Sequence, residues 1–285
     1  MDFEQLSALS LQVGSTPLID LFCPETKRPL NISAKLEYIN PTGSHKDRES
    51  LLVVEDCLSK GLNSVGCASS GNFALSLAYF AQQAGLVCHI WISSHTSELR
   101  KTLLQMYKPI IHESEASLFQ LVSISDKIMS NSDIYNANPG MCDLKSYANQ
   151  SIAMEIVQQS SSITSIYACV NNGTHLLGLA AANTSLQING VYTYEPLAAS
   201  ICGFSKVEGF KNINDAISNS SGHLHEADIN DISIGQRIAQ HNGLIIENAS
   251  AATIGVAFRH MDPNTRVCCV LTGSGMKYPD EYIRL

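Results

Sequence analysis

Apolar runs of strand length alternate with segments of helical periodicity along this 285-residue chain, and this alternation limits the fold more than any other feature. Strands are expected at residues 32–36, 64–68, 87–92, 110–112, 166–170, 191–194 and 267–271. Helices are expected at residues 47–59, 72–84, 97–107, 117–129, 147–159, 176–186, 232–241 and 251–259. The alternation predicts an α/β protein with a largely parallel sheet, and the polar stretch 200–231 is expected to form connecting loops.

Composition and charge exclude several classes of function. The formal net charge of −8 would repel a phosphate backbone, so no nucleic-acid partner is expected. No apolar run approaches the roughly 20 residues of a membrane-spanning helix, and the N-terminus lacks the basic and apolar regions of a signal peptide. The nine cysteines form no Cys-x-x-Cys pair, which indicates buried thiols and no zinc site. We therefore expect a cytoplasmic protein without a metal or a membrane partner.

One lysine stands where an expected strand, a short loop and an expected helix meet. Lys46 follows residues 40–45, Asn-Pro-Thr-Gly-Ser-His, and directly precedes the helix. The positive end of a helix opposes protonation of a lysine, and a neutral lysine can attack an aldehyde. The placement suits Schiff-base chemistry, although a surface lysine at a helix start would give the same pattern.

Three further sites follow the ends of expected strands. Residues 69–72, Ser-Ser-Gly-Asn, are small enough for backbone amides to approach an anion, although Asn72 would also serve as a simple N-cap. Residues 171–175, Asn-Asn-Gly-Thr-His, could cradle a phosphate or form a structural turn. Residues 272–275, Thr-Gly-Ser-Gly, follow the last strand. Four such sites fit ligand binding at the carboxyl edge of a parallel sheet.

Together these motifs resemble those of the pyridoxal phosphate-dependent enzymes of the tryptophan synthase β-subunit family, which includes cysteine synthase, threonine synthase and serine/threonine dehydratases. The matches run in order through residues 14–18, 43–48, 69–72, 172–174, 243–252 and 272–275. Lys-Asp-Arg at 46–48 and Ser-Ser-Gly-Asn look most like threonine synthase. The resemblance implies a two-lobed α/β fold of the tryptophan synthase β type, each lobe a mostly parallel sheet flanked by helices, with pyridoxal 5′-phosphate as cofactor.

The resemblance also implies roles for individual residues. Lys46 would hold the cofactor as a Schiff base and shuttle the α-proton of the substrate, and Asn72 would hydrogen-bond the ring hydroxyl. The cofactor phosphate would be held by Asn171, Asn172, Gly173, Thr174 and His175. Substrate would be bound by Ser69, Ser70 and Thr42. Thr272 would donate to the pyridine nitrogen without protonating it, which favours elimination or replacement over transamination.

The leading hypothesis is β-elimination or β/γ-replacement on a small amino acid, in a threonine synthase-like form. The alternatives are a cysteine synthase-like β-replacement in a specialised pathway and a non-catalytic family member that acts as a binding partner. Departures from the family pattern leave the substrate open: Asn171-Asn172 replace common glycines, Ser274 stands where threonine synthases usually have histidine, and Glu247-Asn248 replaces Glu-Pro. A phosphate-ester substrate would need a second anion site, with Arg48, Arg100, Arg237 and Lys277 as candidates.

The expected division of the chain follows the same resemblance. Residues 1–47 and 138–285 are expected to form a larger cofactor-binding lobe, and residues 48–137 a smaller mobile lobe. The turn-rich segment 136–143 would carry the chain back between them. The resemblance also implies a homodimer.

Overall fold

The computed structural model describes residues 8, 10–201, 210–260, 262 and 264–279. They form two compact units: unit 1 contains residues 40–148 with the described part of 1–13, and unit 2 contains residues 14–39 and the described residues from 149 onward. The expected boundaries lay at residues 47 and 138. The loop before Lys46 groups with unit 1, because the backbone N–H of Thr42 donates to the Asp47 carboxylate at 2.6 Å.

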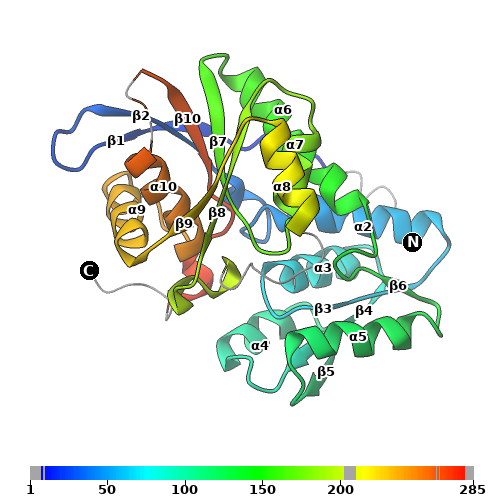
Figure 1. Ribbon diagram of the computed structural model, residues 1–285. Coiled ribbons are helices and arrows are strands. Elements are labelled where there is room, and N and C mark those ends of the chain that lie inside the picture. The colour runs from blue at the N-terminus through cyan, green and yellow to red at the C-terminus, as the bar shows by residue number, and fades with distance from the viewer. Residues whose placement is uncertain (1–7, 9, 202–209, 261, 263, 280–285) are drawn as a thin grey trace. The chain divides into compact units, whose positions relative to one another are not determined.

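Unit 1 is built on a four-stranded parallel sheet in the order β5-β4-β3-β6 (Figure 1). Its strands are β3 (Ser64–Ala68), β4 (Val87–Ser93), β5 (Ile110–Ser114) and β6 (Ile134–Asn136), and its helices are α2 (Lys46–Ser59), α3 (Asn72–Gln83), α4 (Glu98–Gln105) and α5 (Leu118–Met129). Alternate residues of the strands face opposite layers. Cys67 packs in the core formed with α2 and α3, and Ala68 packs in a smaller cluster with Leu121 and Met129 of α5.

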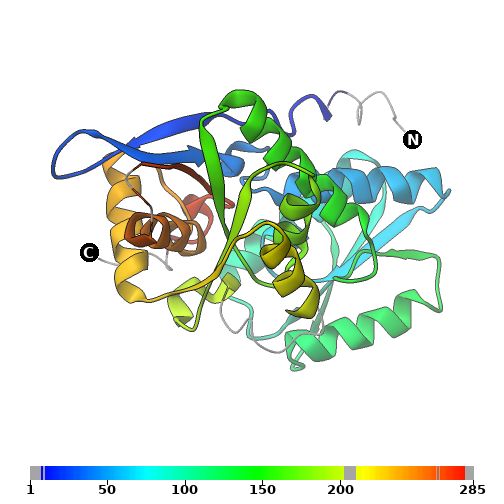
Figure 2. The ribbon, with the colours of Figure 1, turned by 45° about the horizontal axis from the view of Figure 1, so that its top comes forward.

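Unit 2 holds a six-stranded sheet in the order β1-β2-β10-β7-β8-β9 (Figure 2). Its strands are β1 (Leu18–Phe22), β2 (Pro29–Lys35), β7 (Ile163–Cys169), β8 (Gln187–Thr193), β9 (Leu224–Ala227) and β10 (Arg266–Val270). Only the β1–β2 pair is antiparallel. The helices are α6 (Leu144–Gln159), α7 (Thr174–Ala181), α8 (Phe210–Asn219), α9 (Ile229–His241) and α10 (Asn248–His260), and the first residues of α6 belong to unit 1. Unit 2 also contains three short 3-10 helices: η1 (Glu37–Ile39), η2 (Pro196–Ile201) and η4 (Gly275–Lys277).

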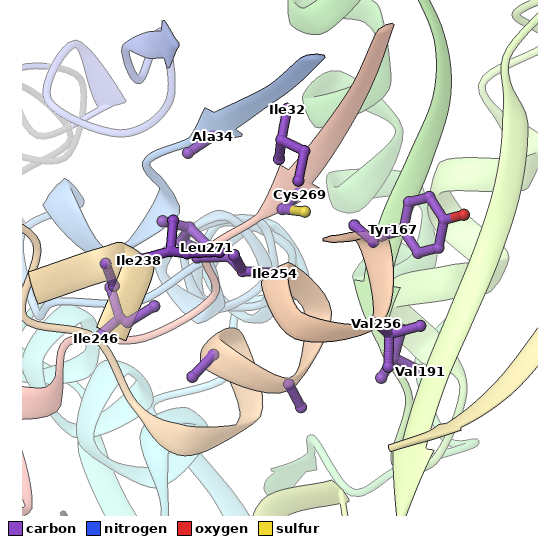
Figure 3. Close-up of a cluster of buried hydrophobic side chains, with 14 of the residues drawn as sticks. Ile32, Ala34, Tyr167, Val191, Ile238, Ile246, Ile254, Val256, Cys269 and Leu271 are labelled. Carbon is purple, nitrogen blue, oxygen red and sulfur yellow. The ribbon is translucent and has the colours of Figure 1, made fainter. Parts of the chain in front are cut away.

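The central strand β10 separates two apolar layers of unit 2. Val267 and Cys269 pack with α9 and α10, in the cluster of Figure 3. Cys268 and Val270 point the other way, into a cluster with residues of α6, α7 and α8. A strand buried on both faces is typical of a parallel sheet covered by helices.

A fully buried lysine fixes β2 against α6 within unit 2. The Lys35 ammonium donates to the Thr16 carbonyl at 2.6 Å, to the Glu155 carboxylate at 2.6 Å and to Gln159 Oε1 at 2.9 Å. Lys35 is 0% exposed, so these three acceptors replace the water that its charge has lost. This cluster is a structural anchor of the sheet.

The fold class is confirmed, and each of the seven expected strands and eight expected helices has a counterpart. The expectation of loops across 200–231 was wrong, because α8, β9 and the start of α9 lie there. Ile213 and Ile217, one helical turn apart, bury the inner face of α8. Residues 202–209, with Cys202, lie outside the described residues. No helix in the described part of the chain is long and apolar enough to cross a bilayer.

Candidate active site

Lys46 is the first residue of α2, directly after a tight turn. The turn is closed by the Gly43 N–H, which donates to the Asn40 carbonyl at 2.8 Å, and Gly43 has a positive φ of 81° that favours glycine. The Thr42 hydroxyl and backbone N–H both donate to the Asp47 carboxylate, which is fully buried. This local network holds the turn and the first residues of α2 in one geometry.

The Lys46 side chain is partly exposed and ion-paired. Its Nζ lies 2.7 Å from Oε1 of Glu49, and the two side chains are 18% and 2% exposed. His45 Nε2 lies 4.0 Å from the same carboxylate oxygen. The reactive lysine expected from the sequence therefore has a buried carboxylate as its direct partner in unit 1.

The Ser69-Ser70-Gly71-Asn72 loop connects β3 to α3, as the sequence predicts, and its residues are half-buried. Asn138 holds the residue that precedes the loop: its Oδ1 accepts the Ala68 N–H at 2.7 Å. The Asn138 Nδ2 in turn donates to Ser125 Oγ at 2.7 Å and to Asp126 Oδ1 at 2.8 Å. Asn138 thus fixes the point at which the strand becomes the loop.

In unit 2 the Asn171–His175 segment leads from β7 into α7. Gly173 is the N-cap residue with φ 86°, and a Cβ there would lie 2.3 Å from the Ile213 side chain of α8. Asn171 and Asn172 are exposed, and Asn172 Oδ1 accepts the Thr174 N–H at 3.2 Å. His175 is buried, and its Nδ1 lies 3.0 Å from Asn149 Oδ1. The N–H groups of the first helical turn lie at the positive end of α7, where a helix favours an anion.

Thr272 follows β10 and is 1% exposed. Its hydroxyl donates to Glu247 Oε1 at 2.8 Å and lies 3.2 Å from the Ser250 hydroxyl and 3.3 Å from Cys169 Sγ. Ser250 Oγ accepts the Thr272 N–H at 2.9 Å. Gly273 leaves room for the carboxylate beside them, because a Cβ would lie 2.3 Å from Glu247 Oε2 and the Glu247 side chain would have to shift.

These residues fit pyridoxal phosphate in their chemistry. The cofactor needs a primary amine for its aldehyde, backbone N–H groups at a helix start for its phosphate, and a polar group for its ring nitrogen. Lys46, the glycine-capped start of α7 and the buried Thr272 hydroxyl are groups of these kinds. Gly173 lets the start of α7 pack directly against Ile213, because a Cβ at this position would collide with that side chain. Lys46, Thr42, Ser69, Ser70 and Asn72 belong to unit 1, whereas Asn171, Asn172, Gly173, Thr174, His175 and Thr272 belong to unit 2.

The sequence profile of the family described as "Pyridoxal-phosphate dependent enzyme" matches residues 9–273. This chain belongs to that family. It is therefore an enzyme whose cofactor is pyridoxal phosphate, and the resemblance to the tryptophan synthase β-like enzymes is confirmed.

Two relatives with named activities indicate which members of the family this chain resembles. Threonine synthase from Mycobacterium tuberculosis is 24% identical, over 97% of this chain and 85% of its own. Cysteine synthase from Aquifex aeolicus is 30% identical over 72% of this chain and 66% of its own. These relatives support elimination or replacement chemistry on an amino acid.

Solved structures show the same fold at lower identity. O-ureido-L-serine synthase covers 95% of this chain and 92% of its own with a TM-score of 0.78 and 19% identity. The O-acetylserine dependent cystathionine beta-synthase from Helicobacter pylori covers 97% and 98% with a TM-score of 0.79 and 20% identity.

Three contributors to these sites escaped the sequence analysis. They are Glu49, Asn138 and Glu247 as the partner of Thr272. Only Glu49 left a usable signal, because an acid three residues after a helical lysine shares its face. The other contacts join segments that are distant in the sequence.

Proposed function

We propose that this enzyme catalyses β-elimination or β/γ-replacement on a small amino acid, in a threonine synthase-like form. The observation that carries the proposal is the placement of Lys46 at the head of α2, held by the Thr42–Asp47 turn and paired at 2.7 Å with Glu49. When bound, pyridoxal phosphate supplies the electron sink that amino-acid side chains lack.

The residues of the chain would divide the remaining work. Lys46 would hold the cofactor covalently and move the α-proton of the substrate. Asn72 would orient the cofactor ring, and Thr272 would bond its nitrogen. The segment Asn171–His175 would bind the cofactor phosphate through the N–H groups at the start of α7.

The substrate carboxylate would be held by Ser69 and Ser70, with Thr42 beside the reactive lysine. The half-buried loop after β3 supports this role, because its backbone amides lie at the positive end of α3. Asn138 would keep the loop in place through the Ala68 N–H.

Among the four candidates for a second anion site, Arg100 is the best supported. Its Nη1 lies 3.9 Å from the position that a Cβ would take at Gly71, beside the substrate loop. Arg237 is exposed and ion-paired with Glu25 in unit 2, and Arg48 is 5% exposed. We therefore assign a negatively charged substituent of the substrate, such as a phosphate leaving group, to Arg100.

A substrate panel tests the proposed function. Purified enzyme loaded with pyridoxal phosphate is mixed with O-phosphohomoserine, with O-acetylserine plus sulfide, or with L-threonine, and the products are followed. Threonine and phosphate from the first substrate support the threonine synthase-like activity. Cysteine from the second supports the cysteine synthase-like alternative. Turnover of none of the three, with cofactor bound, refutes the proposal.

We infer from the family resemblance that the enzyme is a cytoplasmic homodimer. The eight cysteines of the described part of the chain are free thiols, which suits a reducing compartment. Light scattering coupled to size-exclusion chromatography measures the oligomeric state, and a monomer mass near the 30.9 kDa of the chain would refute the dimer.

A further inference from the structure

The ion pair between Lys46 and Glu49 is unusual in its burial. An exposed pair three residues apart on a helix contributes little, because water screens both charges. Here the Glu49 carboxylate is 2% exposed and lies 2.7 Å from the Lys46 nitrogen. A carboxylate removed from water costs several kcal/mol unless a cation or donors compensate for it. Its burial and its direct contact with the Lys46 nitrogen therefore distinguish Glu49 from an exposed carboxylate on a helix.

Basic groups from two helices surround this carboxylate. Lys46 and His45 approach it from the start of α2, with His45 Nε2 at 4.0 Å. Lys145, in the first turn of α6, is 4% exposed and interacts electrostatically with both Glu49 and Lys46. Burial lowers the pKa of Lys145, whose ammonium bonds the Ala137 carbonyl and lies 3.9 Å over the Phe73 ring.

The other charged residues at the start of α2 are Asp47 and Arg48. The Asp47 carboxylate is engaged by the Thr42 hydroxyl and N–H. Among the hydrogen bonds of the described residues, the carboxylate that contacts the Lys46 nitrogen directly is therefore that of Glu49.

We propose that Glu49 is a further catalytic residue, which acts as the counter-ion of Lys46 in each step where the lysine nitrogen is a cation. This inference rests on the proposed function, in which Lys46 holds the cofactor and moves the α-proton.

The proton transfer shows what the carboxylate contributes. The C–H bond of the substrate breaks, an N–H bond forms at Lys46, and the electron pair of the C–H bond stays on the substrate. Lys46 becomes an ammonium, and its new charge lies beside the negative charge of Glu49. The carboxylate thus stabilises the charge that develops on the base.

The test compares Glu49→Gln and Glu49→Asp with Glu55→Gln, a control that removes another carboxylate of α2. Glu55 lies more than about two helical turns beyond Lys46. Cofactor-free protein is incubated with pyridoxal phosphate across roughly pH 6–10 and reduced with borohydride, and the mass increment on the Lys46 peptide is measured. This readout requires no turnover.

In Glu49→Gln the pH midpoint of labelling should move down by about one unit or more, because the ammonium loses its counter-ion. Glu49→Asp should move it in the same direction by less, and Glu55→Gln should leave it unchanged. With the best substrate of the panel, kcat of Glu49→Gln should fall on the order of 10²-fold at a nearly constant KM.

An unchanged midpoint and kcat in Glu49→Gln would overturn the inference while leaving the proposed function intact. If wild-type Lys46 takes no label at any pH, the proposed function itself is wrong. Circular dichroism monitors folding, and if Glu49→Gln does not fold, a Glu49→Asp midpoint equal to that of the wild type overturns the inference.

Discussion

The Thr272 hydroxyl donates its proton to Glu247 Oε1 across 2.8 Å, inside unit 2. A hydroxyl has one proton to donate. Because that proton is engaged by Glu247, the Thr272 hydroxyl can only accept a hydrogen bond from a ring nitrogen in this arrangement. The sequence led us to expect Thr272 as a donor to an unprotonated nitrogen. With Glu247 in place, that role would require the hydroxyl to turn away from a half-buried carboxylate.

Removal of this hydroxyl should destabilise unit 2. Thr272→Val keeps the volume and removes the hydrogen bond to the Glu247 carboxylate, at an expected cost of about 1.5–3 kcal/mol in the free energy of unfolding. Thr193→Val is the control, because the Thr193 hydroxyl bonds a neutral carbonyl, that of Ala227, at 2.6 Å; it should cost about 1 kcal/mol. Urea denaturation of the cofactor-free protein measures both values, and equal costs would contradict the role assigned to Glu247.

Replacement of the reactive lysine should abolish activity without unfolding the chain. Lys46→Ala removes the covalent attachment and the base, so turnover should fall on the order of 10³-fold or more. The absorption spectrum of the loaded protein should lose the band of covalently bound cofactor. Substantial residual turnover would refute the assignment of Lys46.

Breaking the ion pair of the buried Lys35 should lower the free energy of unfolding far more than breaking an exposed ion pair. Glu155→Ala leaves the Lys35 ammonium, 0% exposed, without its counter-ion and should lower the free energy of unfolding by about 3–5 kcal/mol. Lys60→Ala breaks the exposed pair with Asp56 and should cost at most about 1 kcal/mol. Thermal and urea unfolding give the two values, and similar costs would argue against the anchor.

Acid should destabilise the fold through His225. Burial lowers its pKa to about 4, with His260, His223 and Arg259 adding repulsion, whereas an unfolded histidine has a pKa near 6.5. Between these values the unfolded chain binds the extra proton, so the stability contributed by neutral His225 is present above pH 6.5 and is lost as the pH falls toward 4. As the pH falls from about 6.5 to about 4, the urea concentration at the unfolding midpoint should decrease less steeply in His225→Gln than in the wild type. His95→Gln, the control at an exposed position, should retain the wild-type slope of midpoint against pH. Identical slopes in all three proteins would exclude His225 as the cause.

Arg100 should select for an anionic substrate. Arg100→Ala should raise KM for the preferred charged substrate of the panel by about 10-fold or more, in keeping with the loss of a charge-assisted hydrogen bond. Lys127→Ala, at an exposed position of α5, is the control for lost positive charge. Steady-state kinetics distinguish them, and an equal KM in all three proteins would remove Arg100 from the substrate site.

Local signals in the sequence were sufficient for the elements that present the site. The Pro-Gly loop before Lys46 predicts a helix from Asp47, and α2 begins one residue earlier. Asn72 was expected to open a helix and does. In both places the decisive interactions lie within a few residues of each other, so pattern and propensity describe them.

Contacts between distant segments were not predictable in the same way. Asn138 reaches Ala68 across 70 residues and Glu247 reaches Thr272 across 25, and no local pattern marks either pair. Helix α8 was missed because most side chains described for it are polar, and among them Ile213 and Ile217 mark the buried stripe. Such features are set by tertiary packing, which overrides local preference.

The close approach of Gly273 to Glu247 limits how this enzyme can diversify. Any side chain at 273 would occupy the space of the Glu247 carboxylate, since a Cβ would lie 2.3 Å from it. A mutagenesis library that randomises position 273 alone should therefore return glycine among its active clones, whereas joint randomisation of 247 and 273 opens other solutions. Glu247 and Gly273 thus share one space beyond the end of β10, and a side chain gained at one position displaces the other.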